Sequence, residues 1–277
     1  MEQGLAPGLH IVATPIGNLG DLSERASETL RNADRILAED TRVTAKLLKH
    51  IGSKVPMNRY DDHSSEAERA RIVARLEKEA IALVSDAGTP LISDPGYKLV
   101  RAARAAGHQV HTLPGPSAAI AALTLAGLPT DRFLFLGFLP AKAKARSETI
   151  SEVASVRATL VLYESGRRLG DTLEELGKQL GSRDAAVIRE ISKLHEECVT
   201  ASLRELAERY ADKAPKGEIV IVVGPPAEKA EPGDDELDIE LDKALKRLSP
   251  SRAAAEVAKK LNVPRKRVYV RALERGK

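Results

Sequence analysis

Short apolar runs alternate with longer amphipathic stretches along the first 225 residues of the chain. The first runs of strand length are residues 9–13, 35–38, 81–85 and 110–113, and the stretches with helical spacing between and after them are 22–33, 43–50, 66–79 and 97–106. A second set of strand-length runs lies at 133–138, 159–163, 186–189 and 218–223, with helical stretches at 169–180 and 203–210. Because strands that alternate with helices form sheets covered by helices, the pattern predicts an α/β fold.

A segment rich in Pro, Gly and Ala separates the two sets. Residues 114–129 predict a turn, a helix that is capped by Ser117, and a stop at Pro129. We therefore expect two α/β domains, at 1–120 and 121–226. The polar residues 227–242 predict a linker, and 243–277 predict two short helices in the outline of a helix-turn-helix.

The charge of the chain is concentrated near its C-terminus. Residues 1–227 have no net charge, residues 228–242 carry −7, and residues 243–277 carry +10. A neutral body with an acidic linker and a basic tail indicates that the tail binds a polyanion such as nucleic acid. The alternative at this point is a solvated pair of charged helices.

Composition excludes several classes of protein. No apolar stretch approaches the ~20 residues of a membrane helix, and the N-terminus lacks the pattern of a signal peptide. Cys198 is the only cysteine, which excludes an internal disulfide and fits a reducing cytoplasm. The six histidines lack metal-ligand spacing, so we expect no metal site. The glycine fingerprints of P-loop and classical dinucleotide-binding proteins are absent.

Two unusually long loops follow predicted strands in the first domain. They are TPIGNLGD at 14–21 and SDAGTPLISDPG at 85–96. Parallel sheets bind ligands at the carboxyl ends of their strands, and Pro and Gly hold backbone groups in preset directions. Asp86 and Asp94 are able to accept hydrogen bonds from an ammonium group or a ribose. The alternative is a pair of structural turns with Asp as helix caps.

Charged residues also stand at the ends of predicted strands. They lie at 39–42, 163–165, 167–168, 189–190, 193 and 195–196. Carboxylates at such positions are suited to deprotonate a hydroxyl, and arginines to hold phosphates. Surface ion pairing is the alternative for each residue taken singly, and the clustering at several strand ends favours a site.

These stretches carry a resemblance. The chain resembles the ribosomal RNA small-subunit methyltransferase I family, within the tetrapyrrole methylase superfamily, through IVATPIGNLGDLSERA, AEDTRVTAKLL, ALVSDAGTPLISDPGYKLV, LPGPSAAIAAL, YESGRRL and KGEIVIVV, among others. The resemblance covers residues 9–223 almost continuously and extends to the tail. It implies two α/β domains of the tetrapyrrole methylase type with a cofactor cleft between them, plus a small helical C-terminal tail.

The resemblance also implies an activity and partners. The family transfers a methyl group from S-adenosylmethionine to the 2′-oxygen of a cytidine in 16S ribosomal RNA. We therefore expect a cytoplasmic homodimer that acts on the small ribosomal subunit and has no membrane partner. The cofactor-binding residues expected from the match are Pro15, Asp86, Ala87, Gly88, Ile92, Ser93, Asp94, Ser117, Ala118, Phe138, Leu139 and Gly217.

Removal of the 2′-hydroxyl proton calls for a base. The candidates are Glu190, Glu164 and Asp40. The expected RNA-binding residues are Arg42, Arg168, Arg189 and Lys193 in the body and Arg265, Lys266 and Arg267 in the tail. The family's Tyr-Glu-Ser-x-His-Arg-Leu motif has Arg167 in place of His here, so this position binds phosphate or is peripheral.

Two other functions stay open on the sequence. One is a methylase that acts on a tetrapyrrole, against which the basic tail and the YES and EDTR motifs argue. The other is a nucleic-acid-binding regulator without catalytic activity, against which the intact SDAGTPLISDPG loop argues.

Overall fold

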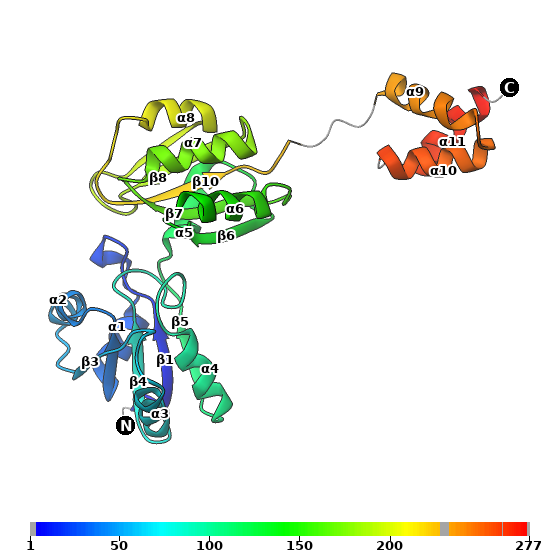
Figure 1. Ribbon diagram of the computed structural model, residues 1–277. Helices are drawn as coiled ribbons and strands as arrows, with labels where there is room; N and C mark the ends of the chain where they lie inside the picture. Colours follow the sequence, from blue (N-terminus) through cyan, green and yellow to red (C-terminus); the bar gives the residue numbers. More distant parts are fainter. Residues whose placement is uncertain (1–3, 228–232, 262, 276–277) are drawn as a thin grey trace. The chain divides into compact units, whose positions relative to one another are not determined.

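The computed structural model describes residues 4–227, 233–261 and 263–275. The chain divides into two compact units, Met1–Pro226 and Ala227–Lys277, and each is described by itself. The larger unit contains two five-stranded sheets, each with its own helices (Figure 1).

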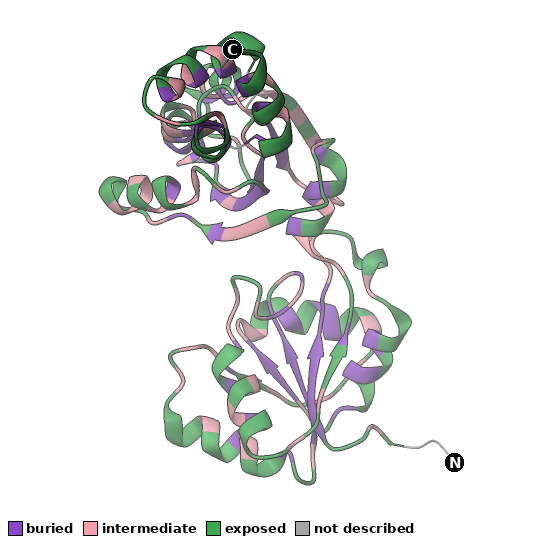
Figure 2. Cartoon of the chain, turned by 90° about the vertical axis from the view of Figure 1, so that its right-hand side faces the viewer, coloured by how far each residue is buried: buried purple, intermediate pink, exposed green. Residues whose placement is uncertain are grey.

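The first sheet is parallel throughout. Its strands are β1 (Gly8–Val12), β2 (Arg35–Ala38), β3 (Met57–Arg59), β4 (Ala80–Val84) and β5 (Val110–Leu113), in the order β3-β2-β4-β1-β5. Its helices are α1 (Glu24–Asn32), α2 (Thr41–Ile51), α3 (Glu66–Arg75) and α4 (Tyr97–Ala105). The central strands β1 and β4 are buried along their whole length (Figure 2) because helices cover both faces of a parallel sheet.

Two apolar cores flank this sheet. Leu30 of α1 and Leu47 of α2 pack with Val12 and Ile36 on one side. Ile72 of α3 and Leu99 of α4 belong to a second cluster on Leu9, Ile81 and Leu83. The alternation of inward side chains along each strand separates the two clusters.

The second sheet is mixed. Its strands are β6 (Phe133–Phe138), β7 (Thr159–Ser165), β8 (Asp184–Arg189), β9 (Glu197–Ser202) and β10 (Glu218–Val223), in the order β6-β7-β10-β8-β9. Only β6 and β7 run parallel, and the other pairs are antiparallel. Helix α5 (Ala118–Ala126) covers one face, and α6 (Ala143–Val153), α7 (Leu169–Leu180) and α8 (Leu203–Tyr210) cover the other.

The predicted α/β fold is confirmed, and several local features differ from the expectation. The sequence pattern predicts neither β3, which has only three residues, nor β9, which is a half-exposed edge strand with Glu, Thr and Ser. It also does not predict α6, in which Ile150 is the one buried residue. Helix α5 packs entirely on the second sheet, with Ala119, Ala122 and Leu123 buried there. The passage between the sheets therefore lies just before α5, a few residues earlier than the expected boundary at 120.

The C-terminal unit is a bundle of three helices. They are α9 (Asp234–Leu245), α10 (Pro250–Leu261) and α11 (Arg265–Arg275). The residues at 234–242 belong to α9 and not to a linker, whereas 228–232 lie outside the described residues. The acidic composition obscures an apolar stripe, since Leu237 and Leu241 stand one turn apart and are fully buried against α10 and α11.

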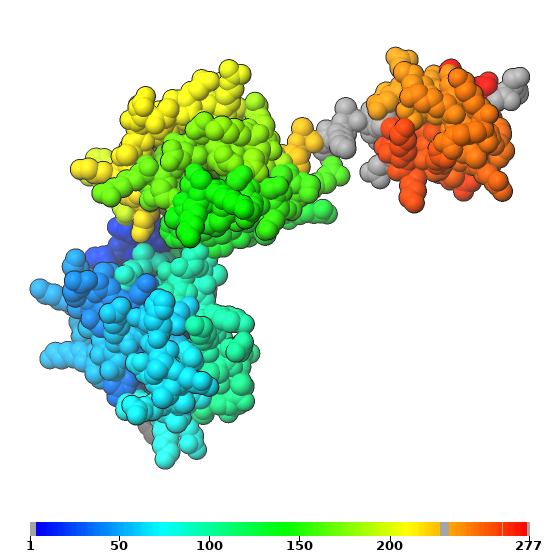
Figure 3. Space-filling model, viewed as in Figure 1, coloured from blue at the N-terminus to red at the C-terminus, as the bar shows by residue number. Residues whose placement is uncertain are grey.

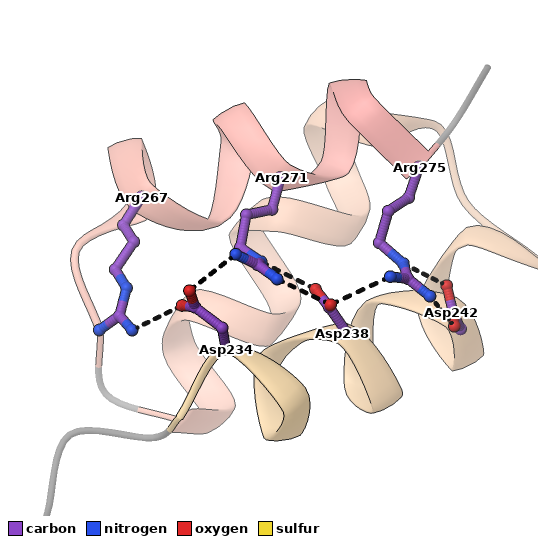
Figure 4. A network of polar contacts seen from close by, with 6 residues as sticks. All are labelled: Asp234, Asp238, Asp242, Arg267, Arg271 and Arg275. Atoms are coloured by element: carbon purple, nitrogen blue, oxygen red, sulfur yellow. Dashed lines mark hydrogen bonds and ion pairs between the residues drawn. The ribbon is translucent and has the colours of Figure 1, made fainter.

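A ladder of charged pairs joins the acidic helix α9 to the basic helix α11 (Figure 4). Asp238 accepts two hydrogen bonds from Arg271, at 2.8 and 2.7 Å, and Asp242 accepts two from Arg275, at 2.8 and 2.6 Å. Asp234 contacts Arg267 and Arg271, each at 2.9 Å. The acidic segment and the basic tail are therefore two halves of one packed unit.

Candidate active site

Three loops meet at the carboxyl ends of the strands in the first sheet. Thr14, after β1, and Gly88, after β4, form an antiparallel bridge with N···O distances of 2.8 and 3.0 Å. The Thr89 hydroxyl donates to the Pro116 carbonyl at 2.9 Å, which joins the loop that follows β5. The two long loops singled out from the sequence are thus held together by backbone hydrogen bonds.

The loop at 85–96 has an unusual backbone. Leu91 and Ser93 have φ values of 75° and 64°, and Gly88 and Gly96 also have positive φ. A left-handed conformation costs a residue with a Cβ roughly 1–2 kcal/mol. Such strain persists where the surrounding contacts require it, and it is concentrated in ligand-binding loops.

A cleft of about 250 Å³ opens beside this loop. The expected cofactor residues that line it are Asp86, Ala87, Gly88, Ile92, Ser93, Asp94, Ser117, Ala118 and Phe138. The opposite side comes from the second sheet, through Tyr163 and Glu164 on β7 and Glu218 to Val220 on β10. The approach is close, since a Cβ on Gly137 of β6 would lie 2.8 Å from the Ser93 hydroxyl oxygen.

Three of the expected cofactor residues lie away from the lining. Leu139 is 2% exposed and packs in the core beneath α6 and α7. Gly217 lies against Glu190, whose Oε1 would be 2.1 Å from a Cβ at that glycine. Pro15 precedes Ile16, and it is Ile16 that faces the cleft.

Other lining residues are not among the cofactor-binding residues expected from the match, although the resemblance implied that Glu218, next to Gly217, lines the same cleft. They are Ile16, Glu39, Thr89, Tyr163, Glu218, Ile219 and Val220. Glu39 directly follows β2, and Glu218 begins β10, so both stand at strand ends. Their position was visible in the sequence, but only the pairing of the strands shows that these ends meet.

Carboxylates dominate the electrostatics of the cleft. Glu39, Asp86, Asp94 and Glu218 all line it. Burial, together with the neighbouring charges of Glu39, Asp86 and Glu218, raises the pKa of Asp94 to about 6. Burial and the charge of Asp86 likewise raise the pKa of Glu39. Crowded carboxylates of this kind favour a cationic ligand.

An aromatic wall forms part of the side that the second sheet contributes, together with Glu164 and Glu218. Tyr163 packs edge-on against Phe135 and Phe138, with ring centroids 5.0 and 5.5 Å apart. The Tyr163 hydroxyl accepts a hydrogen bond from the Ala119 backbone at 3.2 Å, and burial raises its pKa. Phe138 is 57% exposed, so an apolar ring of a ligand has a surface to contact there.

Glu164 lines the cleft but is fully committed to neighbours. Its carboxylate accepts from the Ser165 backbone at 2.8 Å and from the Thr172 hydroxyl at 2.7 Å. Arg168 lies 3.4 Å away and also donates to the Leu139 carbonyl at 2.8 Å. The pair therefore joins the ends of β6 and β7 to α7.

Asp40 and Glu190, the other base candidates, do not line the cleft. Asp40 caps α2 and accepts from the side chain of Arg42, whose hydrogen bonds and charge hold the pKa of that carboxyl well below its usual range. Glu190 has a φ of 53° and pairs with Lys193 at 3.1 Å.

The loop that carries Glu190 contacts the loop after β1. Ser192 donates a hydrogen bond to Asp21, and a Cβ on Gly17 would lie 2.4 Å from the Lys193 side chain. In the space-filling view the blue residues of that first loop meet the yellow part of the chain (Figure 3). Glu190 and Lys193 thus stand where the two domains touch.

Most cations expected to bind RNA already have partners in the chain. Arg42 pairs with Asp40 although its side chain is 88% exposed, and Arg189 pairs with Glu197. In the C-terminal unit Arg265 donates to the Ser251 hydroxyl at 3.2 Å, and Arg267 contacts Asp234. Lys266 is exposed, as is Arg167, the residue that stands at the position of the family's His.

Comparison with known proteins identifies the family. The family model described as Tetrapyrrole (Corrin/Porphyrin) Methylases matches residues 8–207, and the RsmI C-terminal HTH domain matches residues 231–276. A ribosomal RNA small subunit methyltransferase I from Erythrobacter litoralis is 55% identical over 98% of this chain and 96% of its own. The chain belongs to the ribosomal RNA small subunit methyltransferase I family. A protein of the same name from Escherichia coli O157:H7 is 44% identical over 96% of this chain and 94% of its own.

Solved structures with the same fold are more distant in sequence. Diphthine synthase superposes with a TM-score of 0.61 at 18% identity, over 78% of this chain and 89% of that one. The uroporphyrin-III C-methyl transferase from Thermus thermophilus complexed with S-adenyl homocysteine gives a TM-score of 0.53 at 22% identity, over 78% of this chain and 97% of that one. These likenesses confirm the two-domain methylase fold.

The C-terminal unit also matches a domain of this family. The second domain model begins at residue 231, so the family domain includes α9. In the described part of the chain no helix combines the length and apolarity needed to cross a membrane.

Proposed function

We propose that this protein transfers a methyl group from S-adenosylmethionine to the 2′-oxygen of a cytidine in 16S ribosomal RNA. Membership of the ribosomal RNA small subunit methyltransferase I family supports the reaction class and the RNA substrate. The observation that carries the proposal is the cleft in which strained backbone, an aromatic wall and five carboxylates come together.

The residues of the cleft fit this cofactor. S-Adenosylmethionine has a sulfonium and an ammonium group, and the carboxylates of Glu39, Asp86, Asp94 and Glu218 supply the opposite charge. Its adenine ring needs apolar contacts, which Ile92 and Phe138 offer. We assign the binding to these residues together with Ala87, Gly88, Ser93, Ser117 and Ala118.

The cofactor supplies a methyl group that its sulfonium has already activated. The protein's own task is therefore to align the attacking hydroxyl and to remove its proton. Among the three base candidates we favour Glu190. Asp40 is a weak base because its pKa is lowered, and Glu164 is buried with its carboxylate already bound to Ser165, Thr172 and Arg168.

Three features of Glu190 support its assignment as the base. Its backbone is left-handed, its carboxylate is partly exposed, and Lys193 beside it is suited to hold a phosphate. We propose that Glu164 and Arg168 act as positioning residues that fix the cleft end of β7. We also propose that the enzyme is a cytoplasmic homodimer, as its family resemblance implies; sedimentation velocity measures the second point.

The direct test uses purified protein, tritiated S-adenosylmethionine and small ribosomal subunits that lack the modification. The RNA is digested and the labelled nucleoside identified. Label on the 2′-oxygen of cytidine is expected. Label on a porphyrin-type tetrapyrrole supplied in parallel, with none on RNA, would instead establish a tetrapyrrole methylase.

The base assignment has its own test. We expect Glu190→Gln to lower kcat by about 10²–10⁴-fold at an unchanged affinity for the cofactor. Asp40→Asn is the matched control, and we expect it to leave kcat within a few-fold of the wild type. If Glu190→Gln keeps the full kcat of the wild type, Glu190 is not the base that removes the proton.

A further inference from the structure

A groove outside the cofactor cleft lies between α3 and α4. Its floor consists of Ala70 and Val73 on α3 and Ala102 and Ala105 on α4. Larger residues beneath, including Ile72 and Leu99, belong to the core of the first sheet. Small side chains on the outer faces of two neighbouring helices leave a trough of about 670 Å³ above that core.

The wall of the groove is basic and aromatic. Arg69, Tyr97, Lys98 and Arg101 form it, together with the single acid Glu66. Helix α4 carries Lys98, Arg101 and Arg104 and contains no acidic residue. Among the residues that the structure describes, no carboxylate forms an ion pair with Arg69, Lys98 or Arg101.

Other arginines of the protein differ in whether they are paired. Arg35, Arg168 and Arg189 pair with carboxylates, as do those of the C-terminal ladder, whereas Arg25 and Arg132 resemble the groove cations in having no ion pair among the described residues. Lys98 donates to the Asp62 carbonyl, at 3.1 Å, and Arg69 to the Ser64 carbonyl, at 3.3 Å. These partners are neutral, so they leave the positive charges of Lys98 and Arg69 in place.

Tyr97 is the second unusual feature of the groove. Its side chain is 60% exposed in a protein with only 3% aromatic residues. The guanidinium carbon of Arg101 lies 5.9 Å from the centre of its ring. An exposed ring flanked by cations is the arrangement on which proteins stack an unpaired base while holding the adjoining phosphates.

The groove is also tied to the cleft through the chain. Tyr97 follows Gly96 directly, and the loop that ends there contributes Ile92, Ser93 and Asp94 to the cleft. Three residues span at most about 11 Å, so the Cα atoms of Asp94 and Tyr97 are no farther apart than that.

We propose that the groove between α3 and α4 binds a single-stranded RNA segment next to the target nucleotide. Tyr97 stacks on a base of that segment, and Arg69, Lys98 and Arg101 hold its phosphates. The inference rests on the proposed function, because it names a second contact for the same RNA substrate.

The test compares four variants for binding of a single-stranded 16S ribosomal RNA fragment and for methyl transfer to the small subunit. Tyr97→Ala should weaken RNA binding by about 5- to 100-fold, and Tyr97→Phe, which keeps the ring, should retain it. Arg101→Ala should weaken binding and reduce the slope of log affinity against log salt by about 0.7. Arg104→Ala removes the same charge from the same helix outside the groove, and we expect a smaller loss.

Affinity for S-adenosylmethionine is measured in each variant as a check on the fold and the cleft. Tyr97→Ala and Arg101→Ala could leave the RNA affinity, the salt slope and KM unchanged while the wild type is active. That result would overturn the proposed role of the groove and leave the proposed function intact. Wild type that methylates no RNA would overturn the proposed function as well. The variants could instead bind the assembled subunit more weakly while binding naked RNA as tightly as the wild type does. That result would indicate a ribosomal protein as the partner of the groove and would also overturn the proposal.

Discussion

Asp94 lies among four other carboxylates of the cleft, and its pKa is raised to about 6, chiefly because burial disfavours the charged form. Above that pH the carboxylate is charged and attracts a cationic ligand. Below it the carboxyl is protonated and the attraction is lost. The affinity of the cleft for a sulfonium compound therefore decreases as the pH falls through about 6.

This sign gives a prediction for Asp94→Asn. At pH 7.5 the variant should bind S-adenosylmethionine roughly 10- to 100-fold more weakly, since a charge-assisted contact is replaced by a neutral one. It should also lose much of the decrease in affinity between pH 7.5 and 5 that the wild type shows. Isothermal titration calorimetry across this range measures both effects. Asp212→Asn, an exposed change outside the lining, serves as the control, and an equal pH profile for wild type and Asp94→Asn would contradict the assignment.

A comparison of Gly137 with Gly52 distinguishes the effect of backbone strain on stability from the effect of a side chain that enters the cleft. Gly137 has a φ of 63°, and a Cβ there would lie 2.8 Å from the Ser93 hydroxyl oxygen. Gly52 has a φ of 71° with open space around it. Both Gly→Ala changes should lower stability by roughly 1–2 kcal/mol, because both force a side chain into the left-handed region. The clash with Ser93 should add to this loss in Gly137→Ala alone.

Only Gly137→Ala should also weaken cofactor binding. We expect Gly137→Ala to lose more stability than Gly52→Ala because of the clash with Ser93. The double variant Gly137→Ala with Ser93→Ala removes the clashing hydroxyl and should recover part of that additional loss. Thermal unfolding and cofactor titration distinguish the two effects. Equal cofactor affinity in Gly137→Ala and Gly52→Ala would show that the approach of β6 to the loop does not matter for binding.

At the scale of the element, α9 and α11 show how charge patterning organises a small bundle. Acids at positions 234, 238 and 242 recur every four residues, and so do arginines at 267, 271 and 275. Residues four apart on a helix lie on one face, so the two rows meet when the helices pack. The sequence carried both rows, but the assignment of the acidic row to a linker separated them.

The ladder makes a prediction for the stability of the C-terminal unit. Arg271→Ala should lower the thermal midpoint of this unit in the full-length protein, because Asp234 and Asp238 both lose a partner. Lys266→Ala, on the same helix, is the matched control. Hydrogen exchange monitored separately for α9 to α11 locates the effect, and equal protection in the two variants would contradict it.

The pH dependence of the ladder follows from the shifted carboxyls. Hydrogen bonds from the arginines lower the pKa values of Asp234, Asp238 and Asp242. A carboxyl with a depressed folded pKa stabilises the unit above its unfolded value, near 4, and that contribution is lost as the pH falls through the folded pKa. We expect the protection of α9 and α11 to decrease in acid and at high salt.

At the scale of the whole molecule, the cofactor cleft and the most basic segment lie in different units. The cleft is built within the unit that ends at Pro226, whereas residues 243–277 carry the net positive charge. A chain ending at Pro226 should bind S-adenosylmethionine as the full protein does. It should bind ribosomal RNA more weakly and with a shallower salt dependence, because fewer phosphates are neutralised.

Filter binding across salt concentrations measures this difference, with cofactor titration as the control for folding. Because the ladder neutralises three arginines of the tail, the loss of slope should be smaller than its formal charge implies. An unchanged salt dependence would assign RNA binding to the larger unit alone.

The sequence by itself determined most of the strands and helices, the two long loops and the family. Apolar periodicity and turn residues act locally, so 9–13, 81–85 and 218–223 could be recognised as strands without knowledge of their neighbours. The motif at 85–96 identified most of one side of the cleft for the same reason: its residues are consecutive.

Only the tertiary structure decided which distant side chains meet. The pairing of β10 with β7 and β8 brings Glu218 to the cleft, and it is the packing of β7 that commits Glu164 to Thr172 and Arg168. Whether a cation is available or paired depends on such contacts, as α4 and α11 show. Side-chain function depends on neighbours far along the chain, and local sequence patterns do not record those distances.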